Sequence, residues 1–321
     1  MSIKIGIIGA GFIGPAHVEA VRRLGDVEVV ALAASSEEHA NAKARALKIP
    51  RAYGDWRELV ADREVEAIHN TAPNLLHLEI NLAVIAAGKH LIAEKPLGVN
   101  ANETRAMLNA ARAAGIVHAT CFNYRMYPVV QEARARIAEG GLGDIRLIHG
   151  AYLQDWLMFD SDYNWRVDPA TSGVSRAMAD IGSHWADLAQ FVSGKTIVSV
   201  CADLARFFET RRKPQGAVET FAGAATGDLE PYTVTTEDYG SVLIRFSDGA
   251  RGACVISQLS AGHKNGLTLE IEILKLAPLR AVIGLEPVIQ KSLGGFGCAL
   301  ITRIHPSGYS LADFRYSRRG M

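Results

Sequence analysis

Cysteine is scarce in this sequence. Only Cys121, Cys201, Cys254 and Cys298 occur among 321 residues, and each lies more than 40 residues from the next. The lack of any CxxC pair excludes a zinc site built on a cysteine pair and a dense disulfide framework. Because reduced thiols are typical of the cytosol, we expect a cytoplasmic protein.

Net charge and long apolar runs are also lacking. Thirty-four basic residues balance 34 acidic ones, so the chain has no general attraction for nucleic acid or for an anionic membrane. No uncharged apolar stretch is long enough to span a bilayer, and glycines interrupt the apolar N-terminus, which we do not expect to act as an export signal. With 49% apolar and 21% charged residues the chain has enough apolar side chains for a sizeable core, which argues against disorder.

Strand and helix patterns alternate through residues 1–121. Apolar runs predict strands, and amphipathic segments between them predict helices. The expected strands are Ile3–Ile8, Val27–Ala33, Val65–Asn70, His90–Ala93 and Ile116–Thr120, and the expected helices follow Gly14 and span Ser36–Leu47, Asn74–Ala87 and Asn100–Ala114. Such alternation predicts βαβ units and hence an α/β Rossmann domain with a doubly wound parallel sheet.

The pattern changes near residue 121, where we place a domain boundary. Helices are expected at Tyr127–Glu139 and Asp180–Val192, and strands dominate from 197 to 269. Ser241–Phe246 and Ala250–Gln258 flank a Ser-Asp-Gly turn, which predicts an antiparallel hairpin. Residues 122–273 are therefore predicted to form a second, α+β domain.

A glycine-rich loop follows the first predicted strand. It consists of Gly9, Ala10, Gly11, Phe12, Ile13 and Gly14 and matches GxGxxG. Such glycines often only punctuate turns, but here they join a strand to a helix inside a βαβ unit, as a dinucleotide fingerprint requires. The first glycine permits the tight turn, the second admits a pyrophosphate, and the third allows close helix–strand packing. The loop predicts dinucleotide binding.

The next strand ends without a carboxylate. Its tip carries Ser35 and Ser36, whereas NAD-binding domains often place an acidic residue there to bind the ribose 2′-hydroxyl. Small hydroxyl side chains leave room for a 2′-phosphate, which favours NADP over NAD. Ser36 can also act simply as the cap of the following helix.

Further motifs occur in a characteristic order. After the glycine loop come Thr71-Ala72-Pro73-Asn74 with His77, Glu94-Lys95-Pro96-Leu97, Asn123-Tyr124-Arg125 and Asp180-Ile181-Gly182-Ser183-His184. With this set the chain resembles the Gfo/Idh/MocA oxidoreductases over about residues 3–273. The resemblance implies an NAD(P)-dependent enzyme with an open, mainly antiparallel sheet in its second domain, which often forms the interface of a homodimer or homotetramer.

The resemblance also implies a reaction and its residues. The reaction is hydride transfer between nicotinamide and a carbinol carbon of a sugar, cyclitol or related polyol. Lys95, Asp180 and His184 match catalytic positions, and Pro73, Asn74, His77, Glu94, Asn123 and Arg125 match positions that line the cofactor or the active-site cleft. A non-catalytic dinucleotide-binding regulator on the same fold is the alternative, and a glycoside hydrolase that uses transient NAD oxidation is a third.

The residue types fit this chemistry. Histidine can remove the hydroxyl proton as hydride leaves, because its ordinary pKa lies near neutrality. Asp180 and His184 are four residues apart at an expected helix start, so we expect the carboxylate to hold the imidazole. Lys95 can stabilise the developing alkoxide. The bland alternatives are a dipole-stabilised carboxylate for Asp180 and a core histidine for His184.

The segment before Asp180 predicts a substrate pocket. Tyr152, Trp165 and Arg166 offer flat faces for a sugar ring and donors for its hydroxyls, although core packing is the other role open to such aromatic residues. The remaining histidines form no i, i+4 pair and no HExxH motif, so spacing predicts no metal site.

Residues 274–321 depart from the family pattern. They carry seven Lys/Arg and only two acidic residues, Glu286 and Asp313, and show no sustained period of a strand or a helix. A shifted reading frame would produce such an abrupt change, and the domain would then lack edge strands. A divergent tail that covers the sheet or reaches a neighbouring subunit is the other interpretation; resequencing the gene distinguishes the two.

Overall fold

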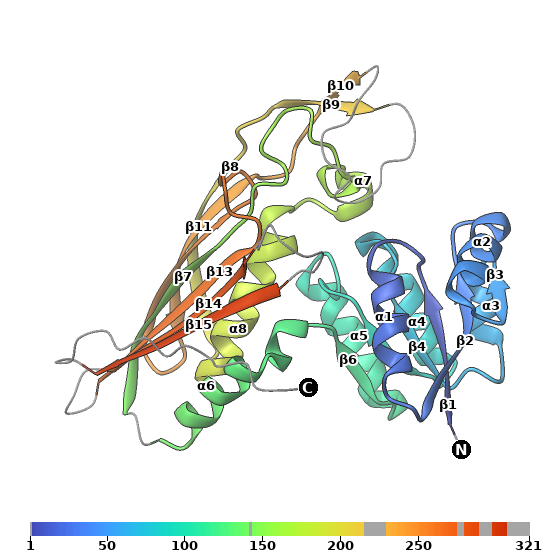
Figure 1. Cartoon of the computed structure of the whole chain (residues 1–321), viewed down its shortest axis with the longest axis horizontal. Helices are drawn as coiled ribbons and strands as arrows, with labels where there is room; N and C mark the ends of the chain where they lie inside the picture. The colour runs from blue at the N-terminus through green and yellow to red at the C-terminus, as the bar shows by residue number, and fades with distance from the viewer. Residues whose placement is uncertain (1, 141–142, 215–228, 275–278, 289–296, 307–321) are drawn as a thin grey trace.

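The computed structural model describes residues 2–140, 143–214, 229–274, 279–288 and 297–306. Two domains lie side by side, each built on one large sheet (Figure 1). Among the described residues, no helix is long and apolar enough to cross a membrane.

The first domain holds a six-stranded sheet in the order β3-β2-β1-β4-β5-β6. The strands are β1 (Ile3–Ile8), β2 (Val27–Ala33), β3 (Arg51–Tyr53), β4 (Ala67–Asn70), β5 (His90–Ala93) and β6 (His118–Thr120). Every neighbouring pair is parallel, which confirms the doubly wound Rossmann prediction. The carboxyl ends of all six strands therefore meet at one edge, where such folds bind their ligands.

Helices cover both faces of this sheet. They are α1 (Ile13–Arg22), α2 (Glu37–Leu47), α3 (Trp56–Ala61), α4 (His77–Ala86), preceded by the 3₁₀ turn η1 (Asn74–Leu76), and α5 (Ala101–Ala114). Ser36 and Asn100 cap α2 and α5, as their hydroxyl and amide oxygens suggest. The sequence analysis missed β3 and α3, since three and six residues are too few for a clear period.

The second domain is built on a seven-stranded sheet, ordered β15-β14-β13-β7-β12-β11-β8. Its strands are β7 (Asp144–Leu153), β8 (Ile197–Ala205), β11 (Tyr239–Phe246), β12 (Arg251–Ser257), β13 (Gly266–Leu274), β14 (Leu279–Val288) and β15 (Gly297–Pro306). All pairs are antiparallel except β7 with β12. The predicted hairpin is confirmed as β11–β12, and the sheet as mainly antiparallel.

Helical segments pack on one face of this sheet and connect it to the first domain. They are η2 (Asn123–Met126), α6 (Pro128–Ala138), η3 (Trp165–Val167), α7 (Pro169–Ser172), η4 (Met178–Gly182) and α8 (Ser183–Ser193); β9 (Thr210–Pro214) and β10 (Leu229–Thr233) form a separate hairpin. In Figure 1, α8 runs along the sheet, and the fully buried Trp185 of α8 belongs to the core that it shares with β7, β12 and β13.

The segment at Asp180 differs from the prediction. The sequence pattern predicted one α-helix over Asp180–Val192, but Met178–Gly182 forms a π-helical turn and α8 begins only at Ser183. In a π-helical turn, each backbone hydrogen bond joins residues that are five positions apart, rather than four as in an α-helix. Such turns are frequent at functional sites. Asp180 therefore lies on a wider turn than His184.

The tail contains regular structure. β14 pairs with β13 and β15 pairs with β14, so the sheet continues beyond the composition change at 274. A shifted reading frame was expected to leave the sheet without edge strands. In the described part of the tail, however, the strands β14 and β15 are present. Residues 275–278, 289–296 and 307–321 lie outside the described residues.

Candidate active site

The glycine loop leaves open space above Gly11. A Cβ built on this residue meets no heavy atom within 4 Å, whereas Gly9 has φ +100° and its Cβ would lie 2.6 Å from the backbone of Thr71. The fold itself thus requires Gly9, but none of the described residues fills the space next to the Cα of Gly11. That open cradle beside the first turn of α1 fits the pyrophosphate of a dinucleotide.

The tip of β2 carries the two serines at the surface. The Ser36 hydroxyl accepts a hydrogen bond from the His39 amide at 3.2 Å, so it caps α2 as the simpler interpretation proposed. Ser35 Oγ lies 3.3 Å from His39 Nδ1. A hydroxyl and an imidazole, rather than a carboxylate, therefore border the expected adenosine ribose.

An ion pair between Lys95 and Asp180 joins the two domains. Lys95 lies two residues after β5, at the carboxyl edge of the first sheet, and Asp180 lies on the π-helical turn before α8. The Lys95 ammonium donates to Asp180 Oδ1 and to the Asp180 backbone oxygen, both at 2.9 Å. The Lys95 and Asp180 side chains are only 14% and 15% exposed, so solvent screens the attraction between them only weakly.

Two more donors hold the same carboxylate. Arg166 Nε donates to Asp180 Oδ1 at 3.2 Å, and the fully buried Gln258 donates to Oδ2 at 3.0 Å. Burial alone would raise the pKa of Asp180, but the Lys95 and Arg166 charges lower it far below its usual range. Asp180 is therefore ionised at every relevant pH. Sequence reasoning missed Gln258, because a glutamine after a strand carries no local signal.

His184 lies beside this pair without a hydrogen bond to it. The expected hydrogen bond between Asp180 and the imidazole is absent among the described contacts, and the Asp180 charge acts only on the pKa of His184, which it raises. The His184 ring packs on Tyr124 at 4.6 Å and edge-on against Phe122 at 5.6 Å. Burial, aided by the Lys95 charge, lowers the pKa of His184 from 6.5 to about 3, so the imidazole is neutral and can accept a proton.

Pro73, Asn74 and His77 occupy the turn between β4 and α4. Pro73 is exposed, and the Asn74 amide donates to the Ser172 carbonyl of the second domain at 3.3 Å. His77 is fully buried, with Nδ1 2.9 Å from Pro96 O and Nε2 2.9 Å from Ala72 O. It ties this turn to the turn that carries Lys95. His77 therefore links these two loops through hydrogen bonds to their backbone oxygens.

Asn123 and Arg125 lie on η2, at the start of the second domain. Asn123 is exposed, whereas Arg125 pairs with Asp187 of α8 through Nε at 2.8 Å and through Nη2. The Arg125 guanidinium also lies 4.8 Å from the centre of the Phe191 ring. Arg125 therefore anchors η2 to α8 and is not joined to the Lys95–Asp180 pair.

Tyr152 is buried beneath the site, and its hydroxyl is bonded to other side chains. Its hydroxyl donates to Asn265 at 2.5 Å, Asn265 donates to the Tyr124 hydroxyl at 3.1 Å, and the two hydroxyls lie 2.6 Å apart. These bonds close a ring when Tyr124 donates to Tyr152. The ring fixes the Tyr124 face on which His184 packs. Sequence analysis did not identify Asn265, which lies 113 residues from Tyr152.

Trp165 and Arg166 lie on η3, against the Lys95–Asp180 pair. The Arg166 guanidinium stacks 4.5 Å from the centre of the Trp165 ring while its Nε bonds Asp180. Arg166 therefore reaches the Asp180 carboxylate, and its Nη1 donates to Asn164 Oδ1 at 3.2 Å. Trp165 supplies a partly exposed apolar face beside it.

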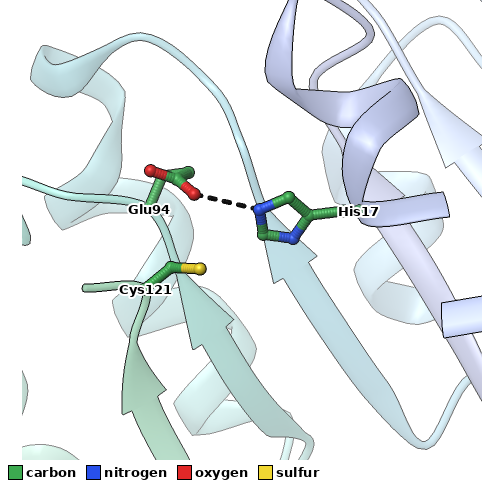
Figure 2. A group of neighbouring side chains, drawn as sticks. All are labelled: His17, Glu94 and Cys121. Atoms are coloured by element: carbon green, nitrogen blue, oxygen red, sulfur yellow. Dashed lines mark hydrogen bonds and ion pairs between the residues drawn. The ribbon is translucent and has the colours of Figure 1, made fainter. Parts of the chain in front are cut away.

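Glu94 lies next to Lys95, and its carboxylate bonds His17 rather than Lys95's partner Asp180. It meets His17 of α1 at 2.9 Å and lies close to Cys121, which follows β6 (Figure 2). His17 in turn contacts His69 of β4 at 3.0 Å. Spacing predicted no metal site, yet three side chains with metal-binding atoms meet here from segments far apart in the sequence.

Fold and site together define a dinucleotide-dependent oxidoreductase. A glycine loop opens onto one edge of a parallel sheet, and an ion pair and a neutral imidazole follow along the same edge. Family models agree: residues 3–121 match the oxidoreductase family with an NAD-binding Rossmann fold, and residues 130–274 match the GFO/IDH/MocA C-terminal domain. The chain belongs to the Gfo/Idh/MocA family, and it is an NAD(P)-dependent dehydrogenase.

Individual relatives support this assignment. The chain is 33% identical over 280 residues to a levoglucosan dehydrogenase of Pseudarthrobacter phenanthrenivorans, covering 84% of this chain and 71% of the relative. A solved levoglucosan dehydrogenase complex with NADH and L-sorbose has a TM-score of 0.79 at 29% identity, covering 94% of this chain and 80% of that one. A D-xylose 1-dehydrogenase (NADP(+)) of Haloferax volcanii is 31% identical over 192 residues, 60% of this chain and 58% of its own length.

The open space at Gly11 generates a test of the dinucleotide site. In Gly11→Val we expect dinucleotide binding to be lost while the thermal unfolding midpoint stays near that of the wild type, because a Cβ at this position meets no heavy atom of the described residues within 4 Å. Titration with NADH and NADPH, followed by nicotinamide fluorescence, measures the binding. Gly14→Val is the contrasting variant: its Cβ would lie 2.4 Å from the Gly9 carbonyl oxygen, so it should lower stability. Undiminished binding in Gly11→Val would refute the assignment of this loop.

Proposed function

We propose that the protein transfers a hydride between nicotinamide and a carbinol carbon of a sugar, cyclitol or related polyol. The observation that carries this proposal is the Lys95–Asp180 pair with a neutral His184 beside it. The relatives named after levoglucosan and D-xylose support a sugar-like substrate. No described feature favours the non-catalytic regulator, since lysine, aspartate and histidine are all present and brought together.

The cofactor fits the residues along the sheet edge. Gly9–Gly14 would hold its pyrophosphate, and the turns at Pro73 and Lys95 border the space toward His184. When bound, the nicotinamide supplies the hydride acceptor for alcohol oxidation and the donor for the reverse reaction.

The chain's own groups manage the proton and the charge. Neutral His184 takes the hydroxyl proton of the alcohol as hydride leaves; its lowered pKa keeps the ring unprotonated across the neutral range, although it also makes the ring a weaker base. The Lys95 ammonium, oriented by Asp180, donates a hydrogen bond to the same oxygen and stabilises the developing alkoxide. Asp180 offsets the charge of Lys95 and Arg166, and so keeps a single excess positive charge facing the substrate.

Substitutions at the two reacting side chains test this mechanism. We expect Lys95→Met and His184→Asn each to lower kcat by about 10²–10⁴-fold, because each removes a proton-transfer or charge-stabilising group. The dissociation constant of the dinucleotide should change little. The substrate for these measurements is first identified by screening sugars and polyols with both cofactors and following nicotinamide absorbance. His118→Asn, at an exposed position on β6, is the matched control. Wild-type turnover in both variants would contradict the proposal.

We also propose that the protein prefers NADP. The support is the absence of a carboxylate at the tip of β2, where Ser35 and His39 lie instead. The dissociation constant for NADP should therefore be lower than that for NAD. Ser35→Asp should reverse the order, because a carboxylate repels the 2′-phosphate and accepts a bond from a 2′-hydroxyl. Tighter NAD binding by the wild type would overturn this preference.

A homo-oligomer is the third element of the proposal. The face of the second sheet opposite α8 exposes Leu243 (64%) and Val255 (38%), and the edge strand β8 exposes Val198 and Val200. Pairing of this face with a second copy would cover it. Light scattering should give a mass of two or four chains of 34.6 kDa, and Leu243→Glu should reduce it, whereas Val117→Glu in the first domain should not. A monomeric wild type would reject the interface.

A further inference from the structure

His17, Glu94 and Cys121 form a cluster with no assigned role in hydride transfer. His17 comes from α1, Glu94 follows β5 and Cys121 follows β6, and Figure 2 shows the three side chains turned toward one another. A nitrogen, a carboxylate oxygen and a sulfur, one from each, lie within 4.8 Å of one another. The His17 and Glu94 side chains are only 9% and 13% exposed.

We propose that His17, Glu94 and Cys121 bind a zinc-class divalent ion in the dinucleotide-free protein, and that the ion and the dinucleotide exclude each other. Imidazole, carboxylate and thiolate are the ligands that zinc takes in proteins, and three of them leave the fourth tetrahedral position to water. Ligands of a tetrahedral zinc lie about 3.3–3.8 Å apart. Small side-chain rotations bring a set within 4.8 Å to that spacing.

The backbone holds two of the ligands firmly. The Cys121 amide donates to Ala93 O at 2.8 Å, and the Glu94 amide donates to Asn70 O at 2.9 Å, so both residues extend the hydrogen bonding of the first sheet. The carboxyl ends of β5 and β6 therefore fix the spacing of carboxylate and thiol. His17 approaches from the buried face of α1.

An outer partner for the histidine is already in place. His17 Nδ1 lies 3.0 Å from His69 Nδ1. Burial, aided by the His17 charge, lowers the pKa of His69 to about 4, so His69 is neutral and one of its nitrogens is free of a proton. With the ion on Nε2, His17 donates its Nδ1 proton to His69 Nδ1, and His69 carries its own proton on Nε2. Metal-binding histidines usually have such a partner, which orients the ring.

Proton balance follows from the same groups. Burial, with the Glu94 charge, raises the pKa of Cys121 to about 12, so the metal-free cysteine is a thiol. The ion displaces this proton, which leaves to solvent. Burial would raise the pKa of Glu94, but hydrogen bonding from His17 and the charges of His17 and Lys95 lower it, so this carboxylate is ionised before the ion binds. Cys121 is therefore the ligand that loses a proton when the ion binds.

The position of the cluster explains the competition. α1 begins at the glycine loop, and Glu94 is joined to Lys95. A dinucleotide with its pyrophosphate at the loop and its nicotinamide at Lys95 has to pass the space between these points. His17 lies on the helix that follows the loop and Glu94 is joined to Lys95, so the proposed competition places the ion with its water beside this path.

Cobalt absorption tests the site without any activity assay. Co²⁺ added to the dinucleotide-free protein should produce a thiolate-to-cobalt charge-transfer band, which Zn²⁺ abolishes by displacement. Cys121→Ser should lose the band, and His69→Phe should weaken cobalt affinity about 10–100-fold through the outer partner. Cys201→Ser, at an exposed cysteine on β8, should keep it. Thermal unfolding checks that each variant is folded, and Cys121→Ala replaces Cys121→Ser if that variant is not.

Two outcomes overturn the site. Absence of the band in the wild type, or a band that survives in Cys121→Ser, shows that these residues do not bind the ion. Competition is measured separately as the dissociation constant of NADH or NADPH with and without Zn²⁺. It should rise at least several-fold in the wild type and in Cys201→Ser, and not in Cys121→Ser. Unchanged affinity in the wild type with zinc bound overturns the competition. Neither cobalt absorption nor dinucleotide affinity depends on sugar oxidation. A failure of the proposed hydride transfer would therefore leave both tests of the metal site intact.

Discussion

The contact on which the active site depends is the ion pair between Lys95 and Asp180. Each partner comes from a different domain, and each is nearly buried, so the pair is strong only while the domains keep their mutual orientation. Arg166 and Gln258 hold the Asp180 carboxylate from the second domain, and His77 ties the Lys95 turn to the neighbouring loop of the first. The electrostatic field at His184 is thus set by groups that neither domain supplies alone.

The same ion pair determines which side chains of the site still have hydrogen-bonding capacity for a ligand. Three donors already bind the Asp180 carboxylate, so it has little capacity left to bind a ligand directly. Lys95 still has an N–H beyond its two bonds to Asp180, since an ammonium has three. This division of labour is consistent with a site that stabilises an oxyanion and takes up a proton with two different side chains.

Much of this could be predicted from sequence where the signal is local. Strands such as Val27–Ala33 and the cap at Ser36 follow from apolar runs and hydroxyl placement, and the structure confirms both. Partners far apart in the chain left no such signal. Asn265 meets Tyr152 only because β13 pairs with β7, and Gln258 reaches Asp180 only because β12 ends beside the π-turn. The prediction that Asp180 and His184 share one helical face assumed a regular α-helix, and the π-helical turn at Met178–Gly182 departs from that geometry.

The parallel pairing of β7 with β12 has a consequence for how the chain folds during synthesis. β7 is the central strand of the second sheet, yet both of its neighbours, β12 and β13, are made about a hundred residues later. At roughly 5–20 residues per second, β7 leaves the ribosome about 5–20 s before either partner exists. The first domain, whose strands pair within short sequence distances, can fold in that interval, and α6 and α8 can form early because helices need only local contacts. The last strands to be made therefore complete the whole second sheet.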